Sequence, residues 1–212
     1  MGDFVNSQST VFSRKKVILL VVFLLILIAD QSLKVWVKLN FHIGEHHPIL
    51  GLEWAFLKFV ENEGAAFGFL LGGETGKVVL TFIRLIATLF IAWVLYKFIK
   101  EKKDYRIQFF LTLVLAGAMG NLIDSMFYGV LFSGSPFHGG VAEWLPPDGG
   151  YAPLFMGKVV DMFYLPLFEI QIPGWIPFVG ESSFKFIQPV FNLADMAIVT
   201  GIAGLLVLYR KW

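Results

Sequence analysis

Four long apolar runs constrain this chain more than any other feature of its sequence. Each is about 20 residues long, the length that a helix needs to cross the roughly 30 Å hydrocarbon core of a bilayer. Hydrophobic residues make up 57% of the 212 residues, which is more than a soluble domain of this size can bury. We therefore predict a membrane α-helical fold, a single integral membrane domain over residues 1–212 with four transmembrane helices. These helices are expected at about residues 15–36, 77–98, 107–131 and 189–209.

The basic residues predict the orientation of the four helices. If the chain crosses the membrane in alternation, three basic clusters lie on one side. The clusters are Arg14-Lys15-Lys16, the group from Lys97 to Arg106, and Arg210-Lys211. Because Lys and Arg are enriched on the cytoplasmic side, both termini are expected there, and the segments at about 37–76 and 132–188 on the opposite side. The first run also resembles the start of a secretory signal peptide, but no small-x-small cleavage site follows, so we interpret it as an uncleaved anchor.

The two outer segments differ in character. Residues 37–76 alternate in part, as in "LEWAFLKFV", and contain several glycines. This pattern predicts a small strand-rich extracytoplasmic unit after the first helix. Residues 133–157 are rich in Gly and Pro, which predicts a long loop between the third and fourth helices.

Four aspartates lie in or beside the apolar segments, on the expected outer side. They are Asp30, Asp124, Asp161 and Asp195. Asp195 is expected about six residues, or roughly 9 Å, inside the last helix. Burying a carboxylate in a membrane costs at least a few kcal/mol, so such residues indicate a functional site. Four of them at a similar depth favour one shared site.

Two of these aspartates occur in the same local pattern, three residues after an asparagine. The pairs are Asn121 with Asp124 and Asn192 with Asp195. A spacing of three places both side chains on one helix face, where the amide can donate a hydrogen bond or line the same cavity. The alternative is purely structural, because polar side chains beside small residues such as Gly117 also hold helices together.

The composition leaves few catalytic chemistries open. The sequence has no cysteine and a net charge of +1, so thiol chemistry is excluded and no broad basic surface for nucleic acid is expected. The adjacent His46 and His47 do not share a face, and neither a metal site nor a cofactor is predicted. Two carboxylates in a site of low dielectric share one proton and perform acid and base catalysis, as in aspartic proteases. A proton relay in a small membrane transport or assembly subunit would use the same residues, so both functions stay open at this point.

Five short blocks run from the first helix to the last. They are "DQSLKVWVK" (30–38), "ENEGAAFGF" (61–69), "GAMGNLIDS" (117–125), "VVDMF" (159–163) and "FNLADMAI" (191–198). In order and spacing they resemble the blocks of the lipoprotein signal peptidases, the type II signal peptidases of bacteria. The longer outer segment, around 133–157 and 168–188, is similar to that of a Bacteroidetes-like variant with a longer periplasmic segment.

The resemblance implies an activity. Members of this family are aspartic endopeptidases that remove the signal peptide of a prolipoprotein on the amino side of a diacylglyceryl-modified cysteine, with water as the nucleophile. The expected partners are therefore diacylglyceryl prolipoproteins and membrane lipid, without nucleic acid. The protein is expected to be a multi-pass protein of the cell inner membrane, with its active site toward the periplasmic side.

The resemblance also implies roles for individual residues. The catalytic aspartates of the family match Asp161 and Asp195. Positions that contact the substrate or brace the cleft match Asn62, Gly64, Asp30, Lys34, Asn121, Asp124 and Asn192. Because Lys34 follows Asp30 by four residues, a structural ion pair on the first helix explains these two as well as substrate contact does.

Two departures from the family pattern affect the site. The family continues its third block as N-x-x-D-R, and here Ser125 stands at the position of the arginine. A hydroxyl cannot replace the bidentate hydrogen bonds of a guanidinium. Arg84, in the second run, is an alternative cation near the cleft, or it is paired with a carboxylate for stability. The long outer insert is the second departure, and it either covers the cleft or contacts a partner.

Overall fold

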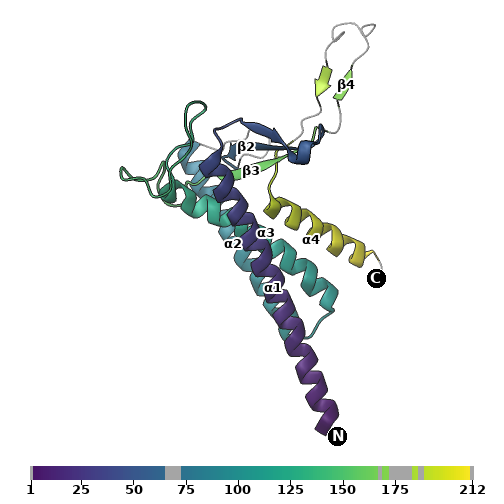
Figure 1. The fold of residues 1–212 in the computed structure, drawn as a ribbon. Helices are drawn as coiled ribbons and strands as arrows, with labels where there is room; N and C mark the ends of the chain where they lie inside the picture. Colours follow the sequence, from purple (N-terminus) through teal and green to yellow (C-terminus); the bar gives the residue numbers. More distant parts are fainter. Residues whose placement is uncertain (1, 65–72, 167–168, 172–182, 186–188, 211–212) are drawn as a thin grey trace.

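In the computed structural model, the described part of the chain folds into four α-helices and a small three-stranded sheet; Figure 1 shows their arrangement. The structure describes residues 2–64, 73–166, 169–171, 183–185 and 189–210. The helices are α1 (Gly2–Asn40), α2 (Gly73–Lys100), α3 (Tyr105–Leu131) and α4 (Leu193–Tyr209). α3 contacts each of the other three helices, and α4 packs mainly against α3. The sheet lies at the end of α1 that is far from the N-terminus (Figure 1).

Three of the helices are long and apolar enough to cross a membrane, judged by length and composition. They are the segments Arg14–Asn40, Thr75–Lys100 and Tyr105–Leu131. α4 is apolar but shorter, with 17 residues. Large apolar side chains point outward from the bundle, and Leu25 is 62% and Ile86 66% exposed. Such a surface is favourable against lipid and unfavourable in water. The predicted membrane α-helical class is confirmed at this level.

Asn192 caps the N-terminus of α4. Its side-chain oxygen accepts the N–H of Asp195 at 2.9 Å, and the carboxylate of Asp195 accepts the N–H of Asn192 at 3.3 Å. This reciprocal capping box starts the helix at Leu193. Asp195 therefore lies in the first turn of α4, and the prediction that it lies about six residues inside a helix is wrong. Asn192 precedes the helix. Asn192 and Asp195 are therefore joined by side-chain to backbone hydrogen bonds of the cap, and they do not share a helix face.

The sheet is antiparallel with the strand order β1-β2-β3. The strands are β1 (His46–Pro48), β2 (Phe56–Asn62) and β3 (Val159–Tyr164), with a short 3-10 helix η1 (Ile49–Gly51) between the first two. β1 and β2 form the strand-rich unit that the sequence predicts after the first helix. β3 pairs with β2 so that Val60 lies opposite Asp161 and Asn62 opposite Val159.

Residues 133–157, predicted as a loop, contain no helix or strand in the structure, apart from the single bridge residue Trp144 that pairs with Phe132. As a description of the whole connection between α3 and α4, the loop is incomplete. β3 follows it directly, and among the described residues a second, separate pair of strands lies further along, β4 (Glu169–Gln171) with β5 (Ser183–Lys185). β3 shows no alternation in the sequence because four consecutive residues, from Val159 to Met162, are all buried.

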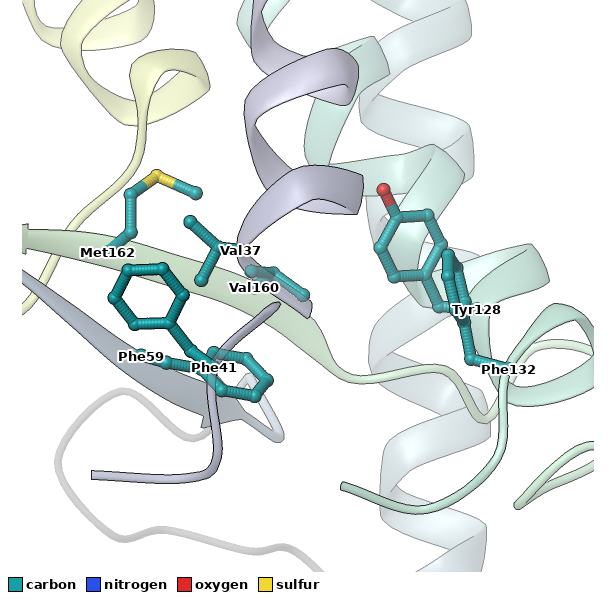
Figure 2. Packing of buried hydrophobic residues seen from close by; sticks show 7 residues of the cluster. All are labelled: Val37, Phe41, Phe59, Tyr128, Phe132, Val160 and Met162. Atoms are coloured by element: carbon teal, nitrogen blue, oxygen red, sulfur yellow. The ribbon is translucent and has the colours of Figure 1, made fainter. Parts of the chain in front are cut away.

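A cluster of buried apolar side chains joins the sheet to the ends of α1 and α3, as Figure 2 shows. Its members come from the last turns of α1, from β2 and β3, and from the end of α3. They are Val37, Phe41, Phe59, Tyr128, Phe132, Val160 and Met162. Successive side chains of a strand point to opposite faces, so Val160 and Met162 face this cluster while Asp161 between them faces the other side of β3. The cluster therefore fixes the direction in which Asp161 points.

The segment after α3 folds back along the end of that helix. The N–H of Phe155 donates to the carbonyl of Met126 at 3.0 Å, and the N–H of Gly157 donates to the carbonyl of Ser125 at 2.9 Å. A Cβ on Gly157 would lie 2.0 Å from the carbonyl oxygen of Asp124, so only glycine fits there. The returning chain thus delivers β3 directly beside Asp124.

The contact between α3 and α4 requires glycine at position 117. A Cβ there would lie 2.2 Å from the carbonyl oxygen of Ala194 and 2.8 Å from a side-chain carbon of Ile198. We expect Gly117→Ala to lower the free energy of unfolding by about 1–3 kcal/mol, the usual cost of overpacking, because the backbone of α4 has to move. Thermal unfolding of the purified protein in detergent measures this. The control is Gly140→Ala, whose Cβ would lie 3.7 Å from Pro136, an ordinary contact. Equal melting temperatures for the two variants would contradict the packing argument.

Candidate active site

A buried ion cluster around Lys34 joins α1 to α3. The ammonium of Lys34 lies 2.9 Å from Asp30 Oδ2 and 2.8 Å from Asp124 Oδ2, and it donates to Asn121 Oδ1 at 2.9 Å. The three charged side chains are at most 1% exposed. The ion pair between Asp30 and Lys34 that the sequence predicts is confirmed, and Asp124 is a second partner that lies far away in the sequence.

The two carboxylates of this cluster also hold the start of α4 and the start of β3. Asp30 Oδ1 accepts the backbone N–H of Ala194 at 2.9 Å, in the first turn of α4. Asp124 Oδ2 accepts the backbone N–H of Val160 at 3.2 Å, in β3. Ala194 immediately precedes Asp195 and Val160 immediately precedes Asp161. The ion cluster therefore sets the positions of the two segments that carry the other two aspartates.

Asp161 is held between two amides on the face of β3 opposite the apolar cluster. Its Oδ2 accepts from Asn62 Nδ2 at 3.1 Å and its Oδ1 from Asn192 Nδ2 at 2.7 Å. Asn62 is itself fixed, because its side-chain oxygen accepts the N–H of Gly64 at 2.8 Å in a tight turn. Burial raises the pKa of Asp161 from 3.8 to about 7; the hydrogen bond from Asn62 opposes this rise and the charge of Asp195 adds to it. Asp161 therefore holds a proton far more readily than an ordinary carboxyl group.

Asp195 occupies a more open environment in the first turn of α4. Its Oδ1 accepts from Asn121 Nδ2 at 2.8 Å, and its side chain is only partly buried. Asn121 and Asn192 are also bonded to each other, with 3.1 Å between Asn192 Nδ2 and Asn121 Oδ1. Amide groups thus connect Asp195 to Asp161, and the two carboxyl groups are close enough for the charge of one to change the pKa of the other.

The structure brings the predicted site residues into one network of hydrogen bonds and ion pairs. Lys34 connects Asp30, Asp124 and Asn121; the two asparagines connect Asp161 to Asp195; and Gly64 joins through the turn of Asn62. The helix-bracing interpretation of Asn121 and Asp124 also has support, because Asp124 is completely buried beside Lys34. Asn121 hydrogen-bonds to Lys34 on α1 and to Asp195 on α4, and Asp124 bonds to Lys34 on α1 and to Val160 in β3.

Gln31 belongs to the network but is absent from the predicted set. Gln31 donates from Nε2 to Asp124 Oδ1 at 2.9 Å and to the carbonyl of Gly120 at 3.1 Å, and its Oε1 accepts from the hydroxyl of Tyr128 at 3.2 Å. Adjacent residues on a helix point in different directions, so a glutamine beside Asp30 gave no signal. Gln31 and Tyr128 are 97 residues apart in the sequence and come into contact only when the chain folds.

A buried carboxyl group with a raised pKa, linked through amides to a partly exposed carboxyl group, resembles the arrangement of acid and base in aspartic peptidases. The fold and the site therefore define a helical membrane protein with a paired-aspartate site. The sequence profile of the family described as Signal peptidase (SPase) II matches residues 22–210. The chain belongs to this family. The predicted family is confirmed, and so is the predicted enzyme class, an aspartic endopeptidase that processes prolipoprotein signal peptides.

Individual relatives agree with the family profile. The chain is 44% identical over 189 residues to a lipoprotein signal peptidase of Porphyromonas gingivalis, an alignment that covers 88% of this chain and 80% of the relative. It is 37% identical over 190 residues to a lipoprotein signal peptidase of Amoebophilus asiaticus, which covers 89% and 75%. A solved structure of a bacterial membrane enzyme matches with a TM-score of 0.57 and 23% identity, over 91% of this chain and 92% of that one. This last likeness concerns the fold alone.

Lys34→Met tests whether the ion cluster holds the site together. The change leaves Asp30 and Asp124 buried side by side without a cation, and breaking a buried pair in this way typically costs about 3–5 kcal/mol. We expect a correspondingly large loss of stability in chemical or thermal unfolding in detergent. The control is Lys97→Met, because Lys97 is 52% exposed and lies 4.0 Å from Glu101, so its ion pair contributes little. A Lys34 variant as stable as the Lys97 variant would contradict a supporting role.

Proposed function

We propose that Asp161 and Asp195 are the catalytic pair with which this signal peptidase II cleaves its substrates. The cleaved bond lies on the amino side of a diacylglyceryl-modified cysteine, and water is the nucleophile. One observation carries this proposal: Asp161 is buried with a pKa of about 7 and is linked through Asn192 and Asn121 to the partly exposed Asp195. No other residues are assigned to the chemical step.

The environments of the two aspartates suggest separate roles. Asp161 holds the proton, donates it to the carbonyl oxygen of the scissile bond as water attacks, and takes a proton back from the resulting gem-diol when the carbon–nitrogen bond breaks. Asp195 lies where water can reach it, takes a proton from that water as it attacks the carbonyl carbon, and passes the proton to the leaving nitrogen when the bond breaks. The amides of Asn62, Asn121 and Asn192 orient the two carboxyl groups without supplying charge.

The remaining predicted residues act through this pair. Asp30, Lys34 and Asp124 brace the cleft because they hold the first turn of α4 and the start of β3. Gly64 permits the turn that aims Asn62, since its φ is +86° and a side chain would be strained there. Substrate contact is assigned to the surroundings of Asn62 and Asp195, where the site is partly exposed.

The location of the site supports one orientation in the membrane. The start of α1, the α2–α3 connection and the end of α4 lie away from the sheet (Figure 1). The basic residues from Lys97 to Arg106 lie at the α2–α3 connection, Arg210 lies at the end of α4, and the basic residues 14–16 lie in the first half of α1. We place this side in the cytoplasm, with the active site at the periplasmic boundary of the cell inner membrane. In this arrangement residues 1–212 form one integral membrane domain, in which the substrate approaches laterally through the lipid.

Substitution of either aspartate tests the catalytic pair. Asp161→Asn and Asp195→Asn are each expected to lower the cleavage rate more than about 100-fold, because each removes an acid or base from the reaction. The assay is conversion of a diacylglyceryl prolipoprotein peptide by purified protein in detergent. The same substitution at the exposed Asp148 is the control and should leave the rate unchanged. Cleavage that survives in both site variants would exclude the pair.

The pKa of Asp161 predicts the pH dependence of cleavage. A carboxyl group with a pKa of about 7 is protonated below that pH and loses its proton as the pH rises through it. Because the proposed acid must carry its proton, kcat/KM should fall above about pH 7. The hydrogen bond from Asn62 lowers the pKa of Asp161, so Asn62→Ala should move this alkaline limb to higher pH while it lowers the rate. A limb that stays in place or moves to lower pH would contradict the assignment of the acid.

A further inference from the structure

Arg84 lies in the apolar first half of α2 and reaches across to α3. Its Nη1 donates to Ser125 Oγ at 2.6 Å, and Ser125 Oγ donates to the carbonyl of Asn121 at 2.8 Å. Ser125 is 1% exposed and directly follows Asp124. The guanidinium is therefore anchored in the aspartate network, on the helix turn that carries Asn121 and Asp124.

The sequence leaves open whether this arginine is paired with a carboxylate for stability. Among the residues that the structure describes, the ion pairs contain no partner for Arg84 within 4.0 Å. An arginine inside an apolar helix is costly and is usually retained for a function or for a direct partner. Its direct hydrogen-bond partner here is a neutral hydroxyl. A simple structural ion pair does not account for it.

A second contact connects Arg84 to the turn that holds Asn62. A Cβ on Gly64 would lie 2.9 Å from Arg84 Nη2 and 3.3 Å from its Cζ, so the guanidinium packs directly against this glycine. The N–H of Gly64 donates to Asn62 Oδ1, and Asn62 Nδ2 donates to Asp161. The guanidinium thus lies between Ser125 on α3 and the turn that aims an amide at Asp161.

The charge of Arg84 differs in its effect from that of Lys34. Lys34 is buried between two carboxylates, so its single positive charge is offset by the two carboxylates in direct contact with it. The charge of Arg84 acts on Asp124, Asp195 and Asp161, without a carboxylate in direct contact. A cation in this position favours the ionised form of nearby carboxyl groups.

We propose that Arg84 is a positioning residue of the Asp161–Asp195 pair: its positive charge favours ionisation of the pair, and it fixes the turn from which Asn62 contacts Asp161. This proposal rests on the catalytic role of the two aspartates. The small side chain of Ser125 leaves the space into which the guanidinium enters from α2. A guanidinium at position 125 would approach the same space from α3.

The variants separate charge from shape. Arg84→Met removes both, and it should lower kcat/KM by about 10-fold or more and move the acidic limb of the pH profile up by about one unit, since loss of a nearby cation makes the carboxyl pair as a whole harder to ionise. Arg84→Lys keeps the charge but not the planar fork, so the acidic limb should stay in place while the rate falls. Ser125→Arg, added to Arg84→Met, should restore the position of the limb. Arg106→Met is the matched control, because Arg106 is 65% exposed and paired with Asp104 at the opposite end of α3.

The outcomes distinguish this inference from the function on which it rests. If the unaltered protein does not cleave the peptide, or if Asp161→Asn and Asp195→Asn remain active, the catalytic pair is wrong whatever Arg84 does. If those controls behave as expected and Arg84→Met changes neither rate nor pH profile, the role of Arg84 is overturned. A lower rate with an unmoved limb and no recovery with Ser125→Arg also overturns it, because only packing was lost. Should Arg84→Met fail to fold, the pH profile of Arg84→Lys decides: an acidic limb moved up by a unit overturns the charge effect.

Discussion

The positions of the two segments that carry Asp161 and Asp195 depend on the burial of one ammonium group between two carboxylates. Lys34 cannot be withdrawn from water at a tolerable cost unless Asp30 and Asp124 are both placed beside it, and those carboxylates in turn require donors for their other oxygens. The donors are the first turn of α4 and the start of β3. Because each partner is needed by the others, a shift of any one element exposes a buried charge or leaves it unpaired. Packing of apolar side chains against lipid offers no such specificity.

The four aspartates acquire two different properties from their surroundings. Asp30 and Asp124 both contact the ammonium of Lys34, which holds the two carboxylates in place as fixed anchors. Asp161 and Asp195 face amides, which orient a carboxyl group but do not neutralise it. The first pair therefore holds structure, whereas the proposed function assigns proton exchange to the second. In that proposal the same type of side chain serves as a brace beside a cation and as an acid or base beside amides.

The sequence predicts the parts of this arrangement that depend on local patterns. Apolar length predicts the long helices, and the spacing of Asp30 and Lys34 predicts their ion pair. The order of the five blocks predicts which residues belong to the site. What it does not predict is set by contacts between distant segments. β3 lacks alternation because it is covered on both faces. Asp195 lies in the first turn of α4 because Asn192 caps the N-terminus of that helix. Gln31 joins the site only because α3 packs beside α1 and brings Asp124 to it.

The insert after α3 illustrates how a segment without a catalytic residue can control catalytic geometry. Ser135 accepts a hydrogen bond from the buried Lys38 at 2.8 Å and donates one to Glu61 Oε1 at 2.7 Å, and Lys38 is also bonded to Glu61. Glu61 directly precedes Asn62, so the start of the insert fixes the end of β2 on the side of the site. Its last residues bind the end of α3 and continue into β3. The part of the insert over residues 133–157 is therefore a tie between β2 and β3, the strands that carry Asn62 and Asp161.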